Sequence, residues 1–239
     1  MLTRGRSGGQ MFRMLKLEPP HGWRPVFWEL GIVTIGVLIA LGAQQLVETI
    51  HWNREVAHTR KALDAELAHN LAAFDYRVSL RPCVAARLAE LKTVLARQRR
   101  GQVVPLKRPI TAPIGFGLGF SVWEVASGEG RSRMPIGTKL QYASLYDMFR
   151  HFVDLDNSED AEWSKLEDFD FASRMDPRDA QLAAGVIKRL EDNNAMLSGF
   201  TAYRRELAQP LRIEAEKDID AKIAEDSRAN RRGLCTPLI

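Results

Sequence analysis

The hydrophobic pattern of the chain begins with one long uncharged run near the N-terminus, where residues 30–43 read LGIVTIGVLIALGA. A helix of this length spans about 21 Å at 1.5 Å per residue, less than the roughly 30 Å hydrocarbon core of a bilayer. Tryptophans stand near both ends of the run, as at membrane interfaces. Apolar residues extend it on either side: Val26, Phe27, Trp28, Leu46, Val47 and Ile50. We therefore predict a transmembrane helix over residues 26–47.

Beyond this run, apolar positions recur with the 3.6-residue period of helices almost to the C-terminus. The stretch 49–80 is expected to continue from the membrane as one amphipathic helix, and the proline- and glycine-rich stretch 101–120 to form a loop. The other helices are expected at 82–100, at 121–128 with a Ser121–Glu124 capping box, from Pro135, from Asp156, from Asp176 to about Gln209, and finally to about Ala229.

No stretch of the sequence alternates between apolar and polar residues as a half-buried strand would. We therefore predict an all-α fold. In this fold the N-terminal transmembrane helix continues into an irregular antiparallel helical bundle.

The net charge of +4 arises entirely in the first 25 residues. That segment holds a single acid, Glu18, against five basic residues: Arg4, Arg6, Arg13, Lys16 and Arg24. Because the rest of the chain is neutral, it lacks the basic surface that a nucleic-acid-binding domain needs, and we expect no nucleic-acid partner. The basic tail favours a cytoplasmic N-terminus, by the positive-inside rule.

We accordingly divide the chain into a basic cytoplasmic tail (1–25), a transmembrane helix (26–47) and a helical extracytoplasmic domain (48–239). In a bacterium this is a single-pass inner-membrane protein with a periplasmic C-terminal domain. A cleaved signal peptide is the alternative, because Ala40-Leu41-Gly42 resembles a small-x-small cleavage site. No helix breaker separates Ala43 from the helical pattern that follows it, which favours an uncleaved anchor.

Small residues lie on one side of the predicted span: Gly36, Ala40 and Ala43. Their spacing is that of helices that pack closely in membranes. A homodimer through the transmembrane helix is therefore a hypothesis.

The two cysteines, Cys83 and Cys235, are expected to form a disulfide. A periplasmic domain lies in an oxidising compartment, where a pair of thiols tends to bridge. The alternative is two unrelated thiols, with Cys83 a small core residue and Cys235 exposed.

Three Glu-x-x-His pairs form the strongest metal-binding pattern in the chain: Glu48/His51, Glu55/His58 and Glu66/His69. Di-iron bundles use this spacing, but on two different helices and with further glutamates. All three pairs here fall on one stripe of one helix, mostly turned away from its apolar face. We expect this stripe to face solvent, and we predict no metal and no cofactor.

Other candidate sites lack residues that their chemistry requires. The acidic run 154–162 mimics a calcium loop but has Glu159 where glycine is needed and Lys165 where glutamate is needed, so helix capping is the preferred interpretation. The glycines of 115–119 are not followed by the Gly-Lys-Ser/Thr of a phosphate loop. His151 has acidic neighbours and is expected on the surface. The sequence thus holds no catalytic signature, and we do not expect an enzyme.

Several motifs together resemble a known family. They are Trp28-Glu29-Leu30 and Gly36–Leu41 with Gln44 and Trp52, then Cys83, then Ser121–Gly128, and finally Tyr142 with Leu145-Tyr146. In these motifs the chain resembles an uncharacterised family of bacterial single-pass inner-membrane proteins. The resemblance implies a membrane anchor and a helical extracytoplasmic domain, and it carries no activity.

The expected function is that of a membrane-anchored interaction or scaffold protein that meets an unknown periplasmic protein. The alternative is a small-molecule sensing or binding module anchored to the inner membrane. Its pocket would be lined by four aromatic residues: Trp123, Tyr142, Tyr146 and Trp163. Aromatic side chains usually belong to the core, which favours the first hypothesis.

Overall fold

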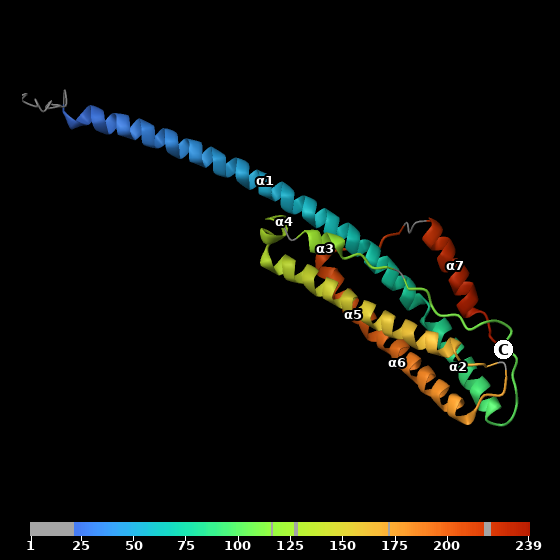
Figure 1. Ribbon diagram of the computed structural model, residues 1–239. Helices are drawn as coiled ribbons and strands as arrows, with labels where there is room; N and C mark the ends of the chain where they lie inside the picture. Colours follow the sequence, from blue (N-terminus) through green and yellow to red (C-terminus); the bar gives the residue numbers. More distant parts are fainter. Residues whose placement is uncertain (1–21, 116, 127–128, 172, 218–220) are drawn as a thin grey trace, which may run out of the picture. The chain divides into compact units, whose positions relative to one another are not determined.

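The computed structural model describes residues 22–239 except 116, 127–128, 172 and 218–220. Every regular element among them is a helix, so the predicted all-α fold is confirmed (Figure 1). The elements are α1 (Trp23–Ser79), α2 (Arg81–Gln98), α3 (Ser121–Val125), α4 (Glu129–Ser132), α5 (Ile136–Glu167), α6 (Pro177–Ala208), the 3-10 turn η1 (Gln209–Leu211) and α7 (Ala221–Cys235). The chain divides into two compact units, residues 1–51 and 52–239.

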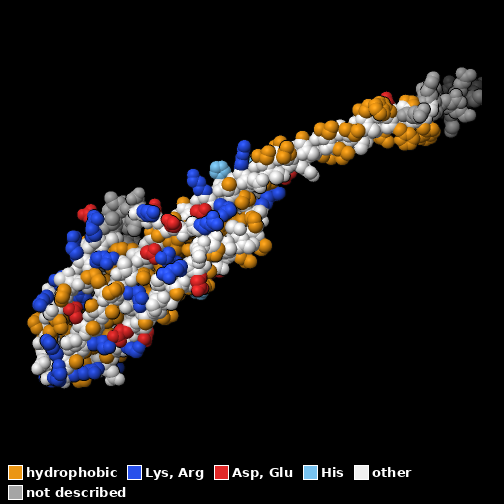
Figure 2. Space-filling model, turned by 180° about the vertical axis from the view of Figure 1, so that it is seen from behind, with side chains coloured by type: hydrophobic (Ala, Val, Ile, Leu, Met, Phe, Trp, Pro, Cys, Tyr) orange, Lys and Arg blue, Asp and Glu red, His pale blue; other side chains and the backbone are white. Residues whose placement is uncertain are grey.

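The described part of the first unit is the N-terminal half of α1, and its apolar side chains are exposed (Figure 2). Within the described residues, one helix near the N-terminus is long and apolar enough to cross a membrane, and none of its most apolar window is buried. The hydroxyls of Thr34 and Thr49 donate to the carbonyl oxygens of Leu30 and Gln45, one turn earlier. Such bonds satisfy polar groups without water. The helix therefore has the chemistry of a span, whereas its orientation stays a prediction.

The small residues of this helix are all exposed: Gly36, Ala40 and Ala43. Apart from its chain neighbours and the nearby backbone of its own helix, a Cβ atom at Gly36 would meet no atom within 4 Å. Helix pairing through these residues stays a prediction.

The second unit is built on the continuation of α1. Helix α5 runs alongside it in the same direction, since Tyr142 meets Asp64 near one end and Glu159 meets Arg77 near the other. Helix α6 returns in the opposite direction and packs on both α5 and α2 (Figure 1). The predicted apolar stripe of α1 is buried against α5 and forms one core cluster with it: Leu63, Leu67, Leu71, Phe74, Tyr146 and Phe149. A second cluster joins α2, α6 and the C-terminal residues: Leu88, Leu91, Val186, Leu190, Leu234 and Leu238.

Helix α5 corrects the prediction that a new helix begins at Asp156. The helix is continuous from Ile136 to Glu167, and no proline or glycine occurs after Gly137 to interrupt it. The acids of 154–162 therefore do not cap a helix. Asp156 and Glu159 turn toward Arg77 of α1 instead.

The predicted capping box of α3 is also wrong. The Ser121 and Glu124 side chains form no cap, and α3 ends at Val125 rather than at Gly128. The amides at the start of α3 are satisfied by Glu66 of α1, whose carboxylate accepts from the backbone N–H groups of Val122 at 2.9 Å and Trp123 at 3.4 Å. A carboxylate from another helix thus supplies the cap.

The C-terminal helix is longer than predicted, while the start of α6 is as predicted. Helix α7 reaches Cys235 instead of ending near Ala229, so the expected non-helical tail begins only after it. Asp176 caps α6 as expected, and its side chain accepts from the backbone N–H of Arg178 at 2.7 Å.

Candidate functional site

A buried polar cluster lies between α1 and α5 and involves Arg77, Asp156 and Glu159. The side chain of Arg77 is 1% exposed and that of Glu159 is 2% exposed. The Arg77 Nη2 atom donates to Glu159 Oε2, and its Nε atom lies 3.8 Å from Asp156 Oδ1. The indole Nε1 of Trp163 donates to the other Glu159 oxygen at 3.3 Å. A buried charge needs such partners, because an unpaired one would be strongly destabilising.

Burial and neighbouring charges raise the pKa values of two acids in this cluster, Asp156 and Asp160. Burial, followed by the negative charge of the neighbouring Asp160, raises the pKa of Asp156 to about 6, against the opposing effect of Arg77. The pKa of Asp160 is also raised, by burial and by Glu159. The loop 101–120 passes directly over Asp156, since a Cβ at Gly115 would lie 2.3 Å from Asp156 Oδ2. The cluster can therefore exchange a proton near neutral pH.

Asp156 should make the stability of the protein depend on pH. Its folded pKa lies above the unfolded value near 3.9, so its contribution is complete below about pH 4 and is lost as the pH rises to about 6. The free energy of unfolding should therefore fall as the pH rises from about 4 to 7, and we expect Asp156→Asn to make this fall smaller by about 2 kcal/mol. Urea unfolding of both proteins at about pH 4 and pH 7 measures the effect.

The matched control for this experiment is Asp192→Asn, because Asp192 is exposed and pairs only on the surface with Lys188 of the same helix. It should leave the pH dependence unchanged. An equal loss of stability between the two pH values in the wild type and Asp156→Asn would contradict the assigned pKa.

The aromatic residues proposed for a pocket belong to the core. Tyr142, Tyr146 and Trp163 are buried, and Trp163 lies in the cluster of α2 and α6 whereas the tyrosines lie in that of α1 and α5. Trp123 stacks on Tyr146 with a ring-centroid distance of 4.9 Å. The four residues therefore do not converge on one pocket.

Glu66 organises the junction of α1, α3 and α5. Besides capping α3, it accepts from the Tyr146 hydroxyl at 2.6 Å. Burial and this bond raise the pKa of Tyr146, while burial and the bond to Asp64 raise that of Tyr142 to about 12. Both phenols therefore stay neutral donors. Close by, the buried side chain of Asn70 bridges the N–H and carbonyl of Gly119 at 2.8 Å each, which holds the loop on α1.

The Glu-x-x-His pairs do not all face solvent as predicted. Glu48, His51, Glu55 and His58 are exposed, but Glu66 is half-buried in the α3 junction. His69 lies 3.3 Å from Glu216 instead of acting with Glu66. Among the residues that the structure describes, no three His, Cys, Asp or Glu side chains are grouped so that they could hold a metal ion.

An open groove of about 700 Å³ runs between the C-terminal end of α5 and the first half of α6. Its apolar floor includes Phe169 and Val186, with Leu182 exposed beside them. Its charged rim holds three basic residues and one acid, Asp168, and two of the basic residues also pair with Glu162. The basic residues are Lys165, Arg178 and Arg189. The groove therefore suits a partner that combines an apolar group with negative charge.

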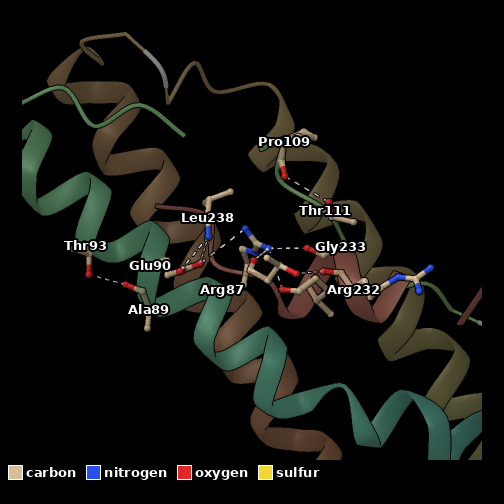
Figure 3. A network of polar contacts seen from close by, with 11 residues as sticks. Arg87, Ala89, Glu90, Thr93, Pro109, Thr111, Arg232, Gly233 and Leu238 are labelled. Carbon is tan, nitrogen blue, oxygen red and sulfur yellow. Dashed lines mark hydrogen bonds and ion pairs between the residues drawn. The ribbon is translucent and has the colours of Figure 1, made fainter. Parts of the chain in front are cut away.

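The C-terminal residues are fixed to α2 by several contacts (Figure 3). Cys83 and Cys235 lie at disulfide distance, with Cα atoms 4.7 Å apart, as expected from the sequence. The buried Arg87 donates to the carbonyl oxygens of Gly233 and Leu234 at 3.0 Å each and so caps the end of α7. Glu90 accepts from the backbone N–H of Leu238 at 3.0 Å.

The sequence analysis did not single out Arg77 or Arg87. For Arg77, however, the pattern of α1 contains a sign of burial. Asn70 and Arg77 are one heptad apart and lie close to the apolar stripe of α1. Polar residues at such positions point to buried partners. When the chain is compared with known proteins, no family model, no curated protein and no solved structure matches it.

Proposed function

We propose that this protein is a membrane-anchored interaction protein whose helical domain binds a partner outside the cytoplasm. The observation that carries the proposal is the exposed apolar surface of α1 in the first unit. Exposure of so many apolar side chains along one helix is unfavourable in water and favourable in a bilayer. The basic residues before it favour a cytoplasmic N-terminus, which puts the helical domain on the other side.

The groove between α5 and α6 is the proposed contact surface for the partner. Its basic rim and apolar floor would recognise a protein segment with a carboxylate next to an apolar side chain. Lys165 and Arg189 already share Glu162, at 2.6 and 2.8 Å, so their positions are preset. Burial opposes ionisation of Glu162, but these bonds prevail and lower its pKa, so it stays charged. Preset groups lose little freedom on binding.

Photocross-linking in membranes tests this proposal. A benzophenone amino acid in place of Gln181, an exposed residue of the groove, should cross-link one protein in the membrane fraction. Arg178→Glu should reduce the cross-link about tenfold, because it reverses a rim charge and like charges repel an acidic partner. A reporter enzyme fused after Ile239 should be active only outside the cytoplasm.

The control position is Ser198, which is exposed on the same helix but does not line the groove. It should give no cross-link to that protein. Equal cross-linking from both positions, or none from Gln181, would argue against the groove. A reporter active in the cytoplasm would argue against the topology.

A small-molecule sensing module is the second candidate, and the size of the groove favours it. A volume of about 700 Å³ lies in the range of small-ligand sites, roughly 300–1,000 Å³. A carboxylate-bearing compound that raises the Tm of the wild type but not of Arg178→Glu, with no protein cross-link from Gln181, would favour this function.

A further inference from the structure

The start of the second unit lies close to the end of the predicted span along the chain. Val47 ends the span and Trp52 begins the second unit, so five residue steps connect them. A chain extends by at most about 3.6 Å per residue, which limits this separation to roughly 18 Å in any arrangement. The headgroup layer is several ångströms thick on each side, so a span embedded in a bilayer would keep the residues around Trp52 at or near the membrane surface.

The residues that pack on α1 at and just after Trp52 come from α4 and from the turn that follows it. The guanidinium of Arg133 lies 4.2 Å from the centroid of the Trp52 ring. Gly130 packs so closely on α1 that a Cβ there would lie 2.4 Å from Thr59 Oγ1. These contacts place residues 131–140 beside residues 52–61, and we call the two segments together the juxtamembrane face.

The juxtamembrane face is basic and carries exposed apolar side chains. Glu55 is its single acid, against six basic residues: Arg54, Arg60, Lys61, Arg131, Arg133 and Lys139. Ile136 is 68% exposed and Leu140 is 58% exposed. The rest of the domain has no such excess, since residues 26–239 as a whole are neutral. A basic surface with tryptophan and branched apolar residues is typical of segments that bind the lipid interface.

We propose that the juxtamembrane face binds the anionic headgroups of the same bilayer that holds the span. Arg133 and Lys139 meet lipid phosphates, while Ile136 and Leu140 enter the boundary between headgroups and acyl chains. A protein partner fits this face less well, because the span keeps Trp52 within roughly 18 Å of the end of the span and so keeps the face close to lipid. The proposal rests on the membrane anchor of the proposed function, and it adds a second, peripheral contact with the membrane.

Photocross-linking of the full chain in vesicles tests the proposal and identifies the class of partner. A diazirine amino acid replaces Leu140 in one sample and Leu182, an exposed leucine of α6, in the other. The vesicles contain either phosphatidylcholine alone or phosphatidylcholine with about one quarter phosphatidylglycerol. Intact-mass analysis separates phospholipid adducts, protein adducts and water adducts, and vesicle flotation reports whether the chain is anchored.

We expect phospholipid adducts at Leu140 to be about tenfold more frequent than at Leu182 in the anionic vesicles. They should fall several-fold in phosphatidylcholine alone and at high salt, because headgroup attraction is screened. The variant Arg133→Glu/Lys139→Glu should lose them while it still floats.

Three results would overturn the proposal. Floating protein with only water adducts at Leu140 would remove the lipid contact and leave the anchor intact. Floating protein with protein adducts at Leu140 would assign the face to a protein or a second copy. Protein that does not float would refute the anchor and with it this inference.

Discussion

Replacement of Arg77 by methionine should lower the free energy of unfolding of the domain by about 3–5 kcal/mol. The guanidinium is 1% exposed and is the cation that faces Glu159 and Asp156. Methionine fills a similar volume but leaves the Glu159 carboxylate buried without a counter-ion. An uncompensated buried charge is costly, whereas a surface pair contributes little. Urea unfolding of the full chain in a mild detergent, followed by circular dichroism, measures the change.

Two variants make this prediction specific. Arg150→Met removes an arginine that is 45% exposed and pairs with Asp147 on the same helix, so it should cost about 1 kcal/mol or less. Adding Glu159→Gln to Arg77→Met should recover part of the loss, because the stranded charge is gone. Equal effects of Arg77→Met and Arg150→Met would show that the buried cluster contributes little to stability.

Removal of the bond between Cys83 and Cys235 should also destabilise the domain. The two cysteines are 152 residues apart, and in the chain-entropy model closure of so long a loop contributes up to about 5 kcal/mol. We expect the variant Cys83→Ser/Cys235→Ser, and the reduced wild type, to melt roughly 10 °C lower. Arg87 and Glu90 still hold the C-terminal residues in both cases, so the domain should remain folded at low temperature.

Thiol labelling checks the same bond directly. The denatured, unreduced protein should contain no reactive cysteine, and reductant should leave the Tm of the double serine variant unchanged. Two labelled thiols in protein taken from cells would exclude the disulfide there. That result would also weigh against an oxidising compartment for the domain.

The sequence by itself determined the helical elements with apolar faces. The buried stripe of α1, the long α6 with its Asp176 cap and the proximity of Cys83 and Cys235 all agree with expectation. The apolar run of residues 30–43 predicts a transmembrane helix, and the described residues include one helix that is long and apolar enough to span a membrane. Local hydrogen bonding and a 3.6-residue period are properties of neighbouring residues, so they can be read along the chain.

Only the tertiary structure decided which polar groups act together. The sequence alone predicts a helix cap at Asp156 and a solvated side chain at Glu66, because a carboxylate at a helix surface suits either role. Their actual partners, Arg77 and the amides of α3, are more than 50 residues away in sequence. Periodicity indicates which face of a helix is buried, but it does not indicate which side chains of other helices contact that face. That choice depends on how α5 and α3 pack on α1, where burial makes each ion pair and cap obligatory.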